Sequence, residues 1–124
     1  MKAVFAIFLG GGLGSLVRFF LGKWVNGLHS FTFPLGTFIV NLVACLLMGF
    51  IIGLAEHKQW LSPTSRLFWT IGVCGGFSTF SAFSSESLTL LQQGQNPSLT
   101  LYVLGSVLLC MTATFLGIFL AERM

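Results

Sequence analysis

The chain has 124 residues, of which 55% are hydrophobic and 7% are charged, and its formal net charge is +3. Soluble domains carry about 25% charged residues, so this composition predicts an integral membrane protein. The small net charge says little about nucleic acid, but the sequence contains no basic patch, so we expect no nucleic-acid partner. Because one helical span needs about 20 residues, four spans fill the chain as a single transmembrane domain over residues 1–124.

The apolar runs predict an all-α fold of four membrane-spanning helices with short connections. The first run contains the glycine-rich stretch GGGLG at residues 10–14, and Pro34, a residue favoured in the first turn of a helix, opens the second. Small residues recur at four-residue spacing, as in Gly49 and Gly53, which allows close helix packing within one subunit or between subunits. The predicted spans are, in chain order, 3–22, 34–54, 67–93 and 99–121.

The charges beside the spans give little preference for one orientation in the membrane. Four spans place both termini and the middle connection on one side, with Lys2, Lys58, Arg66 and Arg123. The other side has Lys23, so the positive-inside rule favours cytoplasmic termini by only a few charges. This weak bias is compatible with a chain that inserts in both orientations.

Polar side chains form stripes along three of the predicted helices. A four-residue spacing places side chains on one helical face. A single serine or threonine in such a helix often bonds its own backbone, but three aligned stripes favour a polar path through the protein. Asn41, at mid-span, is either a structural hydrogen-bonding group between helices or a donor to a passing anion. The stripes are Thr37, Asn41 and Cys45; Ser81, Ser84 and Ser85; and Tyr102, Ser106, Cys110 and Thr114.

The stretch CGGFSTFSAFSSE, residues 74–86, predicts a break in the third helix near the middle of the membrane. Two glycines followed by Ser78 and Thr79 form a poor continuous helix. Broken helices are tolerated at that depth where the freed backbone groups find partners. Freed carbonyl groups suit a cation such as Na⁺, and the amide groups at the start of the next half-helix suit an anion.

Two phenylalanines follow the predicted break. Phe80 and Phe83 are three residues apart, on one side of the second half-helix. Their rings either fill a core or present positive edges to a small anion. A path lined by ring edges, without a fixed cation, would allow the anion both to bind and to leave.

The remaining reactive residues predict no enzyme. His29 and His57 fall in predicted connections, and the sequence contains no nucleophile–base pair or metal-ligand cluster. Cys45, Cys74 and Cys110 are odd in number and lie in apolar runs, so we interpret them as small apolar residues rather than as a disulfide framework.

Over its whole length the sequence resembles the CrcB/Fluc family of fluoride channels. The similarity is carried by GGGLGSLVRF at residues 10–19, GTFIVN at 36–41 and CGGFSTFSAF at 74–83, with Tyr102 and Ser106 in the fourth span. The third motif is the most specific of these. It departs from the common family form at Ser78 and Ala82, where threonine is usual.

The resemblance implies passive fluoride export by an antiparallel, dual-topology homodimer in the bacterial inner membrane, with fluoride and lipid as its other partners. It implies a structural Na⁺ at the dimer centre, held by the backbone carbonyls of Gly75 and Ser78 from each subunit. It also implies a fluoride pathway. The implied pathway residues are Asn41, Phe80 and Phe83 at the pores, Tyr102 and Ser106 alongside, and Thr37, Ser81, Ser84 and Thr114 as a polar track.

Two other functions fit a chain of this size. A small four-helix exporter of cationic drugs would need a carboxylate at mid-span, and the third span offers only Glu86, near its end. A structural membrane subunit without transport activity would not need three polar stripes beside a broken helix.

Overall fold

The structure is a computed structural model and describes residues 1–28, 30, 32–57 and 60–124. His29 and Lys58, which the sequence places in connections, lie outside the described residues. Every regular element among the described residues is helical. The elements are α1 (Lys2–Gly27), α2 (Leu35–His57), α3 (Pro63–Leu67), the π-helix η1 (Phe68–Cys74), α4 (Gly75–Phe77), α5 (Phe80–Gln92) and α6 (Asn96–Glu122).

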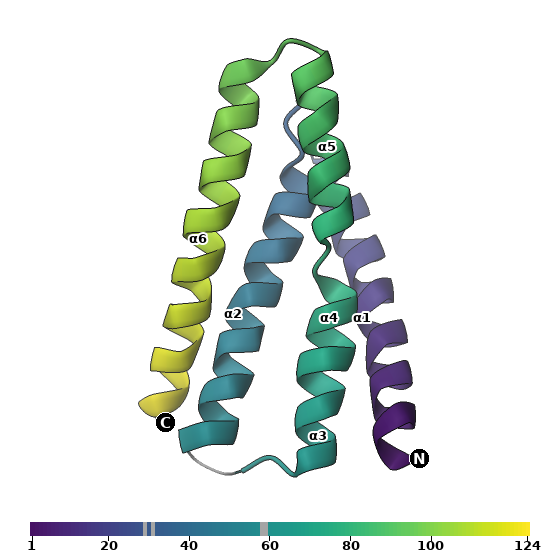
Figure 1. Cartoon of the computed structure of the whole chain (residues 1–124), viewed down its shortest axis with the longest axis vertical. Coiled ribbons are helices and arrows are strands. Elements are labelled where there is room, and N and C mark those ends of the chain that lie inside the picture. The colour runs from purple at the N-terminus through teal and green to yellow at the C-terminus, as the bar shows by residue number, and fades with distance from the viewer. Residues whose placement is uncertain (29, 31, 58–59) are drawn as a thin grey trace.

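Four segments of the described chain are long and apolar enough to cross a membrane, which confirms the predicted fold class. Three of them are the single helices α1, α2 and α6, and the third in chain order combines α3, η1, α4 and α5. Both termini lie at one end of the bundle (Figure 1), as four crossings require. At the other end, α5 and α6 are joined by a tight turn in which Gly94 has a φ of +69°, a conformation that favours glycine.

The helices pack chiefly as two pairs, α2 with α6 and α1 with η1 and α4. Glycines bring the backbones together in both pairs. A Cβ atom added at Gly14 would lie 2.2 Å from the carbonyl oxygen of Val73, and one added at Gly49 would lie 2.0 Å from that of Thr114. These contacts confirm that small residues at four-residue spacing pack helices within one subunit.

The third span starts and proceeds differently from an ordinary helix. Ser62 caps α3, because its hydroxyl accepts a hydrogen bond from the Ser65 N–H at 3.2 Å, and Pro63 occupies the first helical position. The chain then widens into η1, where the Gly75 N–H reaches back to the carbonyl of Thr70. Such π-helical turns are rare and often lie at functional sites.

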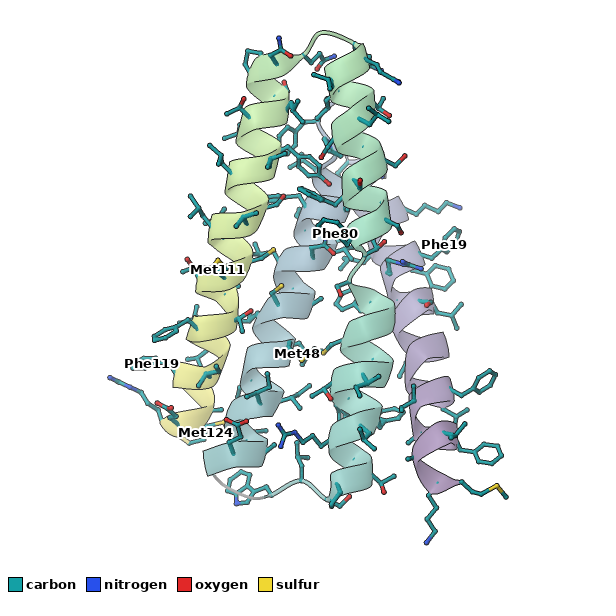
Figure 2. All side chains as sticks on the ribbon, in the orientation of Figure 1. Phe19, Met48, Phe80, Met111, Phe119 and Met124 are labelled. Carbon is teal, nitrogen blue, oxygen red and sulfur yellow. The ribbon has the colours of Figure 1, made fainter. Side chains whose placement is uncertain are left out.

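The outer surface of the subunit is strongly apolar. On α6, Leu108 is 63% exposed, Met111 67% and Phe115 76%. Figure 2 shows Phe19 on α1, and Met111 and Phe119 on α6, directed outward from the helix bundle. Since a water-soluble protein would not leave so many large apolar side chains exposed, this surface fits contact with lipid or with another subunit.

The close approach of α1 to η1 and α4 gives a direct test of the packing. Gly14→Ala places a methyl group against the Val73 carbonyl and should destabilise the protein by about 1–3 kcal/mol, the usual cost of overpacking. Gly12→Ala is the matched control on the same helix, since a Cβ at Gly12 meets nothing within 4 Å. The measurement is the thermal unfolding midpoint of each purified variant in detergent. Equal midpoints for the two variants would show that the helices do not approach as described.

Candidate functional site

The third span is broken at Ser78 and Thr79, within the stretch that the sequence singled out. Ser78 has ψ 155° and Thr79 has φ −149° and ψ 114°, so both residues are extended between α4 and α5. This confirms the predicted break. Gly75 remains helical, with φ −66° and ψ −37°, so the interruption follows the two glycines instead of occurring at them.

Asn41 of α2 holds the broken segment in place. The Thr79 N–H donates to Asn41 Oδ1 at 2.9 Å, and Asn41 Nδ2 donates to the Thr79 carbonyl at 3.4 Å. The side-chain amide thus gives the Thr79 N–H the acceptor that a continuous helix would have supplied, and it adds a second donor to the Thr79 carbonyl, which as the N-cap of α5 already accepts the first bond of that helix. A carboxamide carries two N–H donors, so one N–H of Asn41 is left for a further partner in addition to the Thr79 carbonyl.

The break frees carbonyl groups from their helical partners, among them those of Gly75 and Ser78. In a continuous helix the Gly75 carbonyl would accept from the Thr79 N–H, which donates to Asn41 instead. The Ser78 carbonyl would accept from the Ala82 N–H, which donates to Thr79 Oγ1 at 3.3 Å as the cap of α5. Gly75 and Ser78 are the residues that the family resemblance implies as Na⁺ ligands.

A cavity of about 250 Å³ opens beside the break, between α2, α5 and α6. The hydroxyl oxygen of Ser106 is buried there and has no hydrogen-bond partner in the described chain. Phe80 is 79% exposed, and Figure 2 shows it at the level of the gap between α4 and α5. The lining residues are Asn41, Cys45, Ser78, Thr79, Phe80, Phe83, Ser106, Val107 and Cys110.

A row of aromatic rings leads from the cavity toward the turn between α5 and α6. The ring centroids of Phe80 and Phe83 are 5.5 Å apart, and those of Phe83 and Tyr102 are 5.1 Å apart. Phe33 packs edge to face on Tyr102 at 5.5 Å. The rings of the predicted pathway residues Phe80, Phe83 and Tyr102 thus form one continuous row, which ends at the completely buried Tyr102.

Glu86 lies at the far end of this row and joins three helices. Its two carboxylate oxygens accept hydrogen bonds from Thr37 Oγ1 of α2 and from the Tyr102 hydroxyl of α6, each at 2.7 Å. The stripes in the sequence predicted both hydroxyls on a polar path, but they did not predict Glu86 between them. The sequence did contain a hint of this contact. Thr37 and Tyr102 are the first residues of the polar stripes on α2 and α6, and Glu86 directly follows the serines of α5.

The other predicted pathway residues lie apart from the cavity. Ser81 and Ser84 are exposed on α5, and the Ser81 hydroxyl is 3.2 Å from Thr79 Oγ1. Thr114 Oγ1 donates to the Cys110 carbonyl at 3.0 Å, so its proton is used within its own helix. Sequence reasoning also missed the role of Thr79, whose backbone binds Asn41 and whose hydroxyl caps α5.

Arg18 lines a second, smaller cavity of about 150 Å³ near the same break. Thr37 and Thr79 also contribute to its wall. Arg18 is half-buried, and the cavity that it lines lies between α1, α2 and the start of α5. A cationic residue therefore shares a cavity wall with Thr37 and Thr79.

Comparison with known proteins identifies the family. The pattern of the CrcB-like protein family (Camphor Resistance) matches residues 5–118. The chain is 42% identical over its full length to the complete fluoride-specific ion channel FluC of Flavobacterium psychrophilum. It is 44% identical, over 98% of its length, to the complete channel of that name from Phocaeicola vulgatus, and 40% identical over both full lengths to that from Aquifex aeolicus. The chain therefore belongs to the CrcB family.

Proposed function

We propose that this chain is the subunit of a fluoride-selective channel, through which fluoride leaves a bacterial cell passively across the inner membrane. Relatives at 42% and 44% identity are named fluoride-specific ion channels, which supports fluoride as the transported ion and a role in relieving fluoride toxicity. The observation that carries the proposal is the cavity beside the helix break, where the Ser106 hydroxyl is buried without a partner.

The cavity offers donors without a fixed charge. An unpartnered buried hydroxyl costs about 1–3 kcal/mol, and a fluoride ion that accepts from Ser106 would remove that cost. The free N–H of Asn41 and the positive ring edges of Phe80 and Phe83 would supply further contacts. Because none of these groups is a cation, the ion is held strongly enough to lose water and weakly enough to move on.

Beyond Phe83 the path would continue to Tyr102 and Thr37. Both hydroxyls donate to Glu86, so fluoride can take either donor only in exchange for a carboxylate oxygen. Such an exchange replaces one acceptor by another and needs no large movement of the helices. Ser81 and Ser84, exposed on α5, would join this polar track where a second subunit covers them, and Thr114 would extend it along α6.

The proposed working unit is an antiparallel homodimer with a structural Na⁺ at its centre. The carbonyls of Gly75 and Ser78 fit this role, because the break removes their helical partners and hard cations bind backbone oxygens. Two carbonyls are fewer than a hard cation takes, so a second subunit would complete the site. The Gly75 and Ser78 carbonyls would hold the ion, which would supply a positive charge beside their oxygen atoms. The exposed Gly75 and Phe80 support a partner at this position.

The hydrogen bonds of Glu86 disfavour the cation exporter. A carrier of cationic drugs needs a carboxylate available to its substrate, whereas both oxygens of Glu86 accept hydrogen bonds from neighbouring hydroxyls. We propose no catalytic reaction for the chain.

The test of function is fluoride efflux from liposomes that contain the purified protein, measured with a fluoride electrode. Efflux should begin only when a potassium ionophore compensates the charge, and chloride-loaded liposomes should release far less. Asn41→Asp keeps the acceptor for Thr79 but removes the donors and adds a negative charge, so efflux should fall at least about tenfold, the effect of 1.4 kcal/mol.

Asn96→Asp is the matched control, since Asn96 is exposed at the first position of α6 and lines neither cavity beside the break. Its efflux should equal that of the original chain. Fluoride release no faster than from protein-free liposomes, with the protein folded, would refute the channel. Release without the ionophore would refute passive conduction.

Gly75→Ala tests the proposed ion site. A Cβ at Gly75 meets only the Thr70 carbonyl oxygen, at 3.9 Å, so the subunit itself has room for alanine. The variant should fold normally but lose the Na⁺-dependent part of dimer stability, which is measured by size-exclusion chromatography in sodium and in a large organic cation. Gly22→Ala, where a Cβ also meets nothing nearby, should behave as the original chain. A Gly75→Ala dimer with unchanged Na⁺ dependence would contradict the site.

A further inference from the structure

We infer that the thiols of Cys45 and Cys110 form a binding site for a thiophilic, two-coordinate metal ion, of which the mercuric ion is the best match. Cys45 lies on α2 and Cys110 on α6, each one helical turn before a pair of residues in direct contact, Gly49 and Thr114. Both are half-buried and both line the cavity beside the helix break. The two thiols therefore lie at the same level of this helix pair and line one cavity that a small ion can enter.

The position of the pair follows from the two polar stripes. Cys45 lies one helical turn from Asn41, and Cys110 lies one turn from Ser106. Asn41 and Ser106 line the same cavity. Because α2 and α6 are held together by the glycine contacts at Gly49, the two stripes face each other over more than one turn.

The number and kind of ligand atoms, two thiol sulfurs, indicate which class of metal ion would bind. The described residues contain no group of three or more His, Cys, Asp and Glu side chains that could hold a metal ion. Cys74 is 1% exposed and does not line the cavity. A structural zinc site has four ligands, so a pair of thiols favours a soft ion that accepts two sulfur ligands in a line.

Among soft metal ions, the net charge of the metal–thiolate complex favours a divalent ion. When the mercuric ion binds, two S–H bonds break, two mercury–sulfur bonds form and two protons pass to water. The product of a divalent ion and two thiolates is neutral, whereas a monovalent copper or silver ion leaves one negative charge. A neutral complex is favoured in these apolar surroundings, because burying a net charge is costly.

An ion bound at this pair would lie in the cavity through which fluoride is proposed to pass, one turn from Asn41. If the proposed function holds, mercuric ion should therefore stop fluoride efflux. This consequence rests on the proposed function, but binding itself does not, so the two are measured separately.

Binding is measured on the reduced, purified protein with mercuric chloride, by the ultraviolet absorption of the mercury–thiolate bond and by proton release. We expect one ion per chain and two protons released per ion. A monothiol competitor is then added, and its concentration at half-removal of the ion is determined. The competitor concentration needed to remove half of the ion should be at least about a hundredfold higher for two linked thiols than for one thiol.

Cys45→Ser and Cys110→Ser should each lose this resistance, and each keeps a small polar side chain at its position. Cys74→Ser is the matched control and should bind as the original chain does. Three results would overturn the site. Removal of the ion by the monothiol could stay equally difficult in both single variants, or become easy in Cys74→Ser. The original chain could also bind only one ion per two chains. Binding as expected with unblocked efflux would confirm the site and place it outside the fluoride path.

Discussion

The structure depends on the pair of hydrogen bonds between the Asn41 side chain and the backbone of Thr79. A helix cannot be interrupted in lipid unless its freed polar groups find partners in the protein. Asn41 supplies an acceptor to the Thr79 N–H and a donor to the Thr79 carbonyl. Each such bond contributes about 0.5–1.5 kcal/mol net, and leaving the Thr79 N–H buried and unpaired would cost about 1–3 kcal/mol. The extended conformation of Ser78 and Thr79 is stable because of this pair.

The packing of the helices places Asn41 where that pair can form. Gly49 and Gly117 let the backbones of α2 and α6 approach closely, and Gly14 does the same for α1 against η1 and α4. Asn41 therefore belongs to one tightly packed pair of helices, and Thr79 connects the end of the other pair to α5. The same geometry turns Ser106 and Phe83 toward one cavity. Small residues far from the cavity thus determine the positions of the groups that would contact an ion.

Much of this arrangement could be predicted from the sequence, since the signals are local. Hydrophobic runs predicted the four helices, and the residues 74–79 predicted the break. The partners across helices could not be predicted, because a stripe fixes a face of one helix but not its rotation or height relative to another. Thus Asn41 was expected at mid-span, yet its bond to Thr79 was not, and Glu86 was not placed between Thr37 and Tyr102. The π-helix before the break was also missed, because it depends on packing rather than on residue propensity.

The most direct test of the central interaction is solid-state NMR of the full chain in lipid bilayers. Backbone chemical shifts of Ser78 and Thr79 should be those of extended residues between two helices, and the Thr79 amide should show through-space contact with the Asn41 side chain. In Asn41→Ala the Thr79 signals should shift toward helical values or broaden. Helical shifts for residues 74–80 in the original chain, without a contact to Asn41, would contradict the interrupted helix and the ion-binding groups derived from it.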